Sequence, residues 1–460
     1  MTNTRRSFLK ASLGALGLAA ASPFFIGRGQ GAYANTPAFG KAKHLIYIRL
    51  RGGFRFTTAF NAAVADAFNP FGLATGVADG TSWGVSNLFE NKSFLDGDDG
   101  AKRVALGMAS VPSIANRITV VPCVDHEPTS GSADGNHGSG LDRFWLGSVD
   151  GQAGFFSLIN YGLRERYAAT TAAGGIAMPA FCLGDSGMGR GLGIYAAHRP
   201  PVVQNGSFDG FGLSTEDRVP TWARDLSRMK DESLRDRLRG QSRASVDAFV
   251  ETRRATTRFA EIFRSPILQT KRGTDLIDGV SHDELKLLLG DDSAGQNLRL
   301  ALRLFHFGCP AVYIDQGGYD MHSGEENELP RRIGELARII SGLVAALTRM
   351  THPDGGTYWD HTVVAFGSEF GRTARKSRFN SARGSDHNGD YETRWMSMPF
   401  FGGPVSSPGA QLGETRASDL IALGDVVSYR SILKSLLDVL GCEHDGVFPA
   451  DRPYSPLFAA

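Results

Sequence analysis

The chain has 460 residues, with 49 basic and 48 acidic side chains and a formal net charge of +1. This balance gives no electrostatic reason to expect nucleic acid or an anionic membrane as a partner. Four cysteines are too few for a disulfide framework, and a chain of this length can bury a large core without cross-links. Length alone is compatible with one large domain or with two or three.

The first 34 residues contain the three parts of an export signal. The pair Arg5-Arg6 is followed by an uncharged run of 16 residues from 11 to 26, and then by the small-x-small sequence Ala-Tyr-Ala at 32–34. Paired arginines are typical of the twin-arginine route, and the apolar run is shorter than the ~20 residues that span a bilayer. We expect cleavage after residue 34 and export to the periplasm; the alternative is a retained membrane anchor.

The mature chain differs from the precursor in charge. Removing residues 1–34 takes away four basic side chains and no acidic one, which leaves a formal charge of −3. No later stretch is apolar and long enough to span a membrane. We therefore expect residues 35–460 to form one soluble domain without a transmembrane segment and with no affinity for nucleic acid.

Short apolar runs alternate with helical patterns along the chain. Runs rich in Val and Ile, without polar alternation, are typical of parallel strands buried on both faces. Such runs occupy residues 44–50, 118–124, 311–315 and 362–366. Amphipathic helical patterns at 296–307 and 333–347 lie before and after the third run. This alternation predicts an α/β fold with a doubly wound, mainly parallel sheet and helices on both faces.

Two regions depart from this rhythm. Residues 67–100 contain many Gly, Asn and Asp residues and few periodic positions, so we expect long surface loops there. Residues 215–265 contain dense charge of both signs at helical spacing, which predicts a helical insertion with a solvated face.

Chemically reactive side chains follow the predicted strands, at the edge where an open α/β sheet binds ligands. Taken alone, an Asp after a strand is often a helix cap and a single His is usually structural. Several of them at one edge point to a metal, and mixed His and carboxylate ligands suit zinc, or manganese or iron where oxygen donors dominate. The candidates are His137 and Ser139 after the second strand, Asp320 and His322 after the third, and Glu369, Arg372, Asp386 and His387 after the fourth.

The spacing of these residues suggests individual roles. Asp320 and His322 point the same way if their segment is extended, so both can reach one ion. Glu369 adds an anionic ligand, and Arg372 adds a cation that can hold an oxyanion. Ser139 is the best candidate nucleophile, although a structural role as a helix N-cap also explains it. Thr57 and Thr58, after the first strand, are the next candidates.

Three of these segments resemble a known family in the same order along the chain. They are GGYDMH at 317–322, SEFGRT at 368–373 and the Gly-x-Asp-His sequence at 384–387. The chain is similar there to domain-of-unknown-function family 1501, exported proteins of the alkaline-phosphatase and sulfatase superfamily. The likeness is clearest from about residue 298 to 401 and weaker toward the amino terminus.

The resemblance implies an alkaline-phosphatase-like sheet and a metal centre for hydrolysis of phosphate or sulfate esters. Asp320 and His322 would bind one metal, and Glu369 would replace the aspartate of a Ser-Asp-His-Gly ligand turn. His387, with Asp386, would supply the late ligand. Two ions held in this way would stabilise the attacking and leaving oxygens of the displacement.

The chain departs from the superfamily pattern at the end of its first strand. A metal-binding Asp is expected there, but Phe54, Arg55 and Phe56 occupy these positions, and a cation would repel a metal. The Cys/Ser-x-Pro-x-Arg signature of sulfatases is absent. We therefore expect one divalent ion rather than two.

Two interpretations of the function remain open. The first is an exported metal-dependent hydrolase that acts on an anionic small-molecule or glycan-linked ester of phosphate or a related acid. The second is a non-catalytic periplasmic binding or envelope protein that keeps the fold with a degraded metal site.

The export signal makes a direct prediction. Replacing Arg5 and Arg6 by lysine should leave uncleaved precursor in the cytoplasm, because the twin-arginine route recognises the arginine pair itself. Cell fractionation and immunoblotting measure this. Undiminished export of the Lys-Lys variant would show that the segment is a signal of another kind.

Overall fold

The computed structural model describes residues 40–125, 135–172, 177–184, 187–203, 221–239, 243, 266–269, 273–372 and 395–458. The predicted export signal at 1–34 lies outside these ranges, as do the predicted ligands Asp386 and His387. The remaining candidate residues are all within them.

An eight-stranded sheet forms the centre of the molecule, in the order β12-β2-β9-β8-β1-β7-β3-β4. Neighbouring strands pair in parallel except around β9, which is antiparallel to both β2 and β8. The strands are β1 (His44–Leu50), β2 (Ile118–Asp125), β3 (Phe181–Leu183), β4 (Val202–Val203), β7 (Ala311–Gln316), β8 (Thr362–Gly367), β9 (Trp395–Phe401) and β12 (Val427–Ser428). The predicted fold class is confirmed.

The four predicted strands match β1, β2, β7 and β8 within two residues at each end. Every residue of β1, β2 and β8 is buried, as expected for strands covered on both faces. The strand β9 was not predicted. Its sequence, WMSMPFF, contains a proline and lacks Val and Ile, so it has little of the composition that marks a strand.

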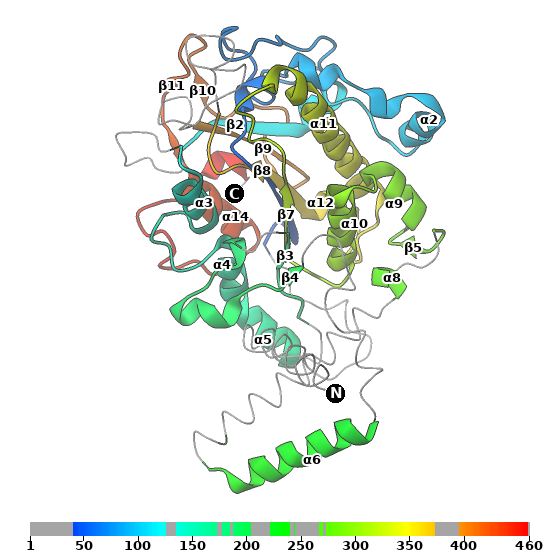
Figure 1. Cartoon of the computed structure of the whole chain (residues 1–460), viewed down its shortest axis with the longest axis vertical. Coiled ribbons are helices and arrows are strands. Elements are labelled where there is room, and N and C mark those ends of the chain that lie inside the picture. The colour runs from blue at the N-terminus through cyan, green and yellow to red at the C-terminus, as the bar shows by residue number, and fades with distance from the viewer. Residues whose placement is uncertain are drawn as a thin grey trace, which may run out of the picture.

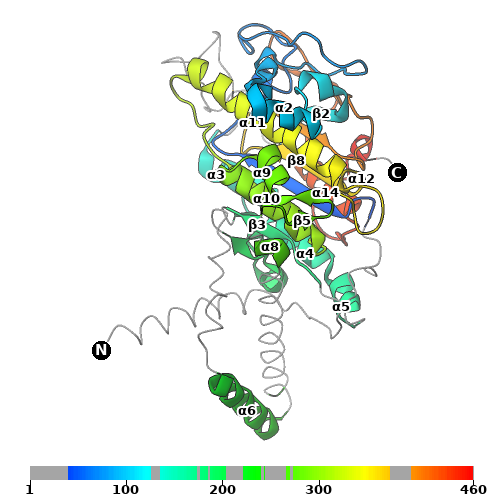
Figure 2. The same ribbon diagram turned by 90° about the vertical axis from the view of Figure 1, so that its right-hand side faces the viewer.

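Helices cover both faces of the sheet. Figure 1 places α9, α10 and α11 on one side and α3, α4 and α14 on the other, and Figure 2 looks onto the α9–α11 side. The helices are α2 (Gly97–Ala105), α3 (His137–Leu146), α4 (Phe155–Gly162), α5 (Arg164–Ala172), α6 (Thr221–Arg237), α8 (Pro266–Gln269), α9 (His282–Leu289), α10 (Ser293–His306), α11 (Glu325–Arg349), α12 (Tyr358–His361) and α14 (Tyr429–Val439). Two small antiparallel pairs complete the described elements: β5 (Leu276–Ile277) with β6 (Val280–Ser281), and β10 (Glu414–Thr415) with β11 (Ala422–Leu423).

The predicted helices are part of longer ones. The pattern at 296–307 is α10, and the pattern at 333–347 is the carboxyl-terminal part of α11. Pro330 lies inside α11. The turns of α11 before residue 333 were not predicted, because proline usually ends a helix at the preceding residue. The region 67–100 is mostly irregular as predicted, with short 3₁₀ turns and the start of α2.

The predicted charged insertion is only partly described. Residues 221–237 form the helix α6, and most of the rest of 215–265 lies outside the described ranges. Across the described ranges, no helix has both the length and the apolar character needed to cross a membrane.

A chain of hydrogen bonds joins two histidines at the amino edge of the sheet. His44 begins β1, and its Nδ1 donates to the carbonyl oxygen of Cys309 at 2.8 Å. The backbone N–H of Asp354 donates to His352 Nδ1 at 3.1 Å, so the proton of His352 is on Nε2 and points at His44 Nε2, 3.1 Å away. Both rings are therefore neutral. His44 thus belongs to this buried pair, at the edge opposite to the one where the sequence analysis expected ligands.

This histidine pair should make the protein sensitive to acid. Burial lowers the pKa of both rings, and the nearby charges of His361 and Lys43 help to lower that of His352 from 6.5 to about 4. The unfolded chain binds protons below pH 6.5 while the folded chain does not, so the stabilisation is complete above pH 6.5 and is lost as pH falls through about 4.

Urea unfolding of the wild type and of His352→Asn as a function of pH measures this effect. The free energy of unfolding of the wild type should fall more steeply between pH 6.5 and pH 4 than that of the variant. Equal slopes would show that the histidine pair does not control acid stability.

Candidate functional site

The carboxyl ends of β1, β7 and β8 meet at one edge of the sheet, and the turn after β1 organises it. Gly52 has a φ of +117°, and a Cβ there would lie 2.4 Å from the backbone nitrogen of Asp320. Only glycine therefore lets the turn after β1 approach the loop after β7 so closely. Phe54 pairs with residues 370–372 through two backbone hydrogen bonds, so the loop after β8 is fixed to the same turn.

Glu369 is an enclosed acidic group at this edge, with 1% of its side chain exposed. Its Oε1 accepts from the backbone N–H of Gly52 at 2.8 Å and from His137 Nδ1 at 3.3 Å. Its Oε2 accepts from Arg49 Nε at 3.3 Å and from the hydroxyl of Ser368 at 3.1 Å. Both oxygens are thus engaged with groups of the protein.

These contacts keep Glu369 ionised. Burial alone would raise its pKa, but the hydrogen bond from His137 and the positive charge of Arg49 outweigh burial and lower the pKa to about 2. The same hydrogen bond raises the pKa of His137. Glu369 is therefore a permanent anion that fixes the orientation of the His137 ring.

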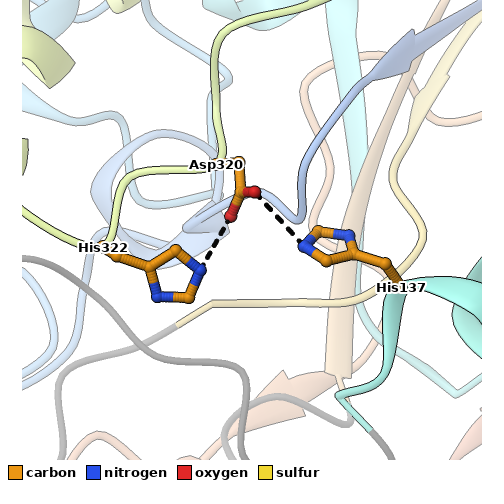
Figure 3. Close-up of side chains that lie close together, drawn as sticks. All are labelled: His137, Asp320 and His322. Atoms are coloured by element: carbon orange, nitrogen blue, oxygen red, sulfur yellow. Dashed lines mark ion pairs between the residues drawn. The ribbon is translucent and has the colours of Figure 1, made fainter.

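Three side chains converge at this edge of the sheet (Figure 3). Asp320 lies between two imidazoles: its Oδ2 is 3.4 Å from His137 Nε2, and its Oδ1 is 3.1 Å from His322 Nε2. One ligand atom from each residue lies within 4.8 Å of the others. We call His137, Asp320 and His322 the ligand triad. Asp320 and His322 therefore lie side by side at the end of the loop that follows β7.

The triad combines segments that are far apart in the sequence. Asp320 and His322 come from the loop after β7, and His137 is the first residue of α3. Asn136 caps α3 by accepting the N–H of Gly138 at 2.8 Å. The helix lies close to the loop after β8. A Cβ added to Gly140 would be only 3.1 Å from the Glu369 carbonyl oxygen.

Arg372 completes the cluster from the loop after β8. Its guanidinium is buried, and its Nε donates to the Gly52 carbonyl at 3.0 Å. Its Nη2 donates to Asp320 Oδ1 and lies 3.2 Å from His322 Nε2. The predicted anion-holding cation is therefore in direct contact with two members of the triad.

Arg55 occupies a different place from the one that the sequence argument implied. Its buried guanidinium pairs with Glu325, the first residue of α11, at 3.1 Å, and donates to the carbonyl oxygen of Phe68 at 3.0 Å. Arg49, inside β1, is instead the arginine that contacts Glu369. Arg55 thus joins the turn after β1 to α11, and the argument that it repels a metal loses its structural basis.

The candidate hydroxyl nucleophiles bond to backbone carbonyls. Ser139 is not the N-cap of α3, which is Asn136, and its hydroxyl donates to the Asn136 carbonyl at 3.4 Å. The buried hydroxyls of Thr57 and Thr58 donate to the carbonyls of Phe68 and Arg55. None of these contacts activates a hydroxyl, because a carbonyl is not a general base.

Sequence reasoning missed two contributors to the site. Arg49 lies near the end of a buried strand, where a charged residue is rare unless it is paired; that rarity was the available signal. The Gly52 N–H is a backbone group and leaves no trace in the side-chain pattern.

Comparison with known proteins identifies one family. The family described as protein of unknown function (DUF1501) has a model that matches residues 197–454, more than half of the chain. The match includes Asp320, His322, Glu369 and Arg372 but not β1 or His137. No curated protein and no solved structure matches the chain.

The enclosure of Glu369 predicts its contribution to stability. Glu369→Gln keeps the shape but removes one of the two carboxylate charges that compensate Arg49, so the free energy of unfolding should fall by about 1.5–3 kcal/mol near neutral pH. The contribution of the wild-type carboxylate is complete above its ordinary pKa of 4.5 and is lost as pH falls through about 2.

Chemical denaturation of Glu369→Gln and of a surface control measures this difference. Glu328→Gln is the control, because Glu328 makes an exposed pair with Arg331 on α11, and its replacement should leave stability unchanged. A Glu369→Gln variant as stable as the wild type would mean that Glu369 does not hold the edge together.

Proposed function

This chain belongs to the DUF1501 family, and we propose that it is a metal-dependent hydrolase of phosphate or related esters that uses one divalent cation. The observation that carries the proposal is the ligand triad: two imidazole nitrogens and one carboxylate oxygen within 4.8 Å of one another, at the carboxyl edge of the sheet.

The donor chemistry of the triad fits a divalent ion. Two imidazoles and a carboxylate suit zinc, and also iron(II) or manganese. Metal-binding histidines commonly donate their second ring N–H to a carboxylate, which fixes the tautomer and strengthens the ligand. Glu369 accepts this hydrogen bond from His137. In this proposal Glu369 is therefore a positioning residue behind the ion rather than a ligand.

The ion and the surrounding side chains would have separate roles in the reaction. A bound ion would supply Lewis acidity toward an ester oxygen. Arg372 would hold the anionic oxygens of the ester, because a guanidinium donates two parallel hydrogen bonds and keeps its charge. Asp320 and His322, both about half exposed, would be the part of the site that a substrate reaches from solvent. Asp386 and His387, in the resembling motif, remain further candidate ligands.

The proposed setting is the periplasm, as the export signal indicates, and the substrate class is an anionic small-molecule or glycan-linked ester. A second function is favoured by Arg372, whose fixed positive charge contacts Asp320 and His322 of the triad. The fold would then bind a metal and an anion at the cell envelope without turnover.

Metal titration tests the ligand triad. Wild-type protein should bind one zinc ion per chain, and His322→Ala should reduce the affinity by about tenfold or more. The matched control is His444→Ala, since His444 also pairs with one aspartate, Asp438, at 2.6 Å but lies outside the triad. Isothermal titration calorimetry gives both the stoichiometry and the affinity.

Activity assays then separate the two functions. Turnover of chromogenic phosphate or sulfate esters that depends on the added ion, and is lost in His322→Ala, supports the hydrolase. Binding of zinc without turnover of any ester supports the binding protein. If neither the wild type nor the control binds zinc, the metal site itself is refuted.

A further inference from the structure

A positive charge lies against the atoms that would bind the cation. Arg372 Nη2 donates to Asp320 Oδ1 and is 3.2 Å from His322 Nε2, so one guanidinium nitrogen faces two of the three ligand atoms. The guanidinium cannot lose its charge, because arginine stays protonated in proteins. A divalent ion bound by the triad would therefore be next to a fixed cation.

The arginine has little freedom to move away. Its side chain has 0% exposure, its Nε donates to the Gly52 carbonyl, and its backbone N–H donates to the Phe54 carbonyl at 2.9 Å. These contacts hold the Nε end of the guanidinium and leave Nη2 directed at the triad. Repulsion between two such charges is strong where protein excludes water.

An anion can turn this repulsion into attraction. Asp320 is the described anion in contact with Nη2, and an ion that takes its oxygens would weaken its pairing with Arg372. An oxyanion with tetrahedral oxygens can accept from Nη2 with one oxygen and face the ion with another. The negative charge would then lie between the two cations.

We propose that Arg372 makes the binding of a divalent cation and of a phosphate-like oxyanion at this site mutually dependent. Without the oxyanion, Arg372 holds Asp320 and weakens cation binding. With it, Nη2 of Arg372 donates to the oxyanion in place of Asp320, which is released to the cation. This inference rests on the proposed function, because it needs the triad to bind the cation, and it adds that each of the two ligands binds tightly only when the other is present.

Thermodynamic linkage makes the inference quantitative. If the oxyanion raises cation affinity by some factor, the cation must raise oxyanion affinity by the same factor. Couplings between sites are typically about 5–150-fold, and direct contact through one side chain places this one at about tenfold or more. A purely structural Arg372 would give no coupling.

Titration of the full-length mature protein with cobalt(II), with and without inorganic phosphate at matched ionic strength, is the test. We expect about tenfold or tighter cobalt binding with phosphate, and an equal gain in phosphate affinity with cobalt. Phosphate also complexes free cobalt, which lowers the apparent affinity, so a measured gain cannot arise from that side reaction.

Two charge-matched variants assign the coupling to one residue. Arg372→Gln should bind cobalt alone more tightly than the wild type and should lose the response to phosphate. Arg331→Gln removes the same charge from the surface of α11, where Arg331 pairs with Glu328 and Glu335, and should keep the wild-type coupling. If Arg372→Gln does not fold, Arg372→Lys keeps the charge without the paired donors and should show a reduced coupling.

The outcomes separate this inference from the proposed function. Cobalt binding that does not respond to phosphate in the wild type refutes the coupling and leaves the metal site standing. The same coupling in the folded Arg372 variant as in the wild type assigns it elsewhere and refutes the role of Arg372. Absence of cobalt binding under both conditions refutes the proposed metal site and the coupling together.

Discussion

The buried carboxylate of Glu369 is the constraint on which the carboxyl edge of this sheet depends. It receives hydrogen bonds from the turn after β1, from the interior of that strand and from the first residue of α3. A buried anion is strongly destabilising unless each oxygen is compensated. The need to satisfy Glu369 therefore determines where Gly52, Arg49 and His137 lie, and through His137 it determines the geometry of the ligand triad.

The positive charge of Arg372 is a second electrostatic constraint, and it disfavours a cation at the triad. Arg372 contacts Asp320 and His322 from a position that is fixed by the Gly52 carbonyl. In the proposed metal site, the same turn would thus support Glu369, which orients His137 toward the cation, and Arg372, which opposes the cation. The ligand triad thus has the negative Glu369 behind His137 and the positive Arg372 beside Asp320 and His322. Such a site is suited to a metal and an oxyanion together, and less suited to either alone.

Much of the fold was predictable because its signals are local. The runs of Val and Ile that form β1, β2, β7 and β8 are continuous in sequence, and Asp320 and His322 are only two positions apart. The family resemblance also drew on the contiguous segments after β7 and β8, and the family match includes both of them.

The parts of the site that were not predicted depend on contacts between distant segments. His137 and Glu369 are 232 positions apart, and nothing in either segment indicates that one supports the other. Arg55 was placed near the metal because it follows β1, but the turn at Gly52 and the ion pair with Glu325 direct it toward α11.

The position of the bound ion is the most direct test of this account. Anomalous diffraction from zinc-soaked crystals should show one ion per chain, bonded to His137 Nε2, His322 Nε2 and an oxygen of Asp320 at about 2.0–2.2 Å. Glu369 should remain behind His137, outside bonding distance of the ion. An ion bonded directly to Glu369, or one that lies away from the triad, would contradict the account.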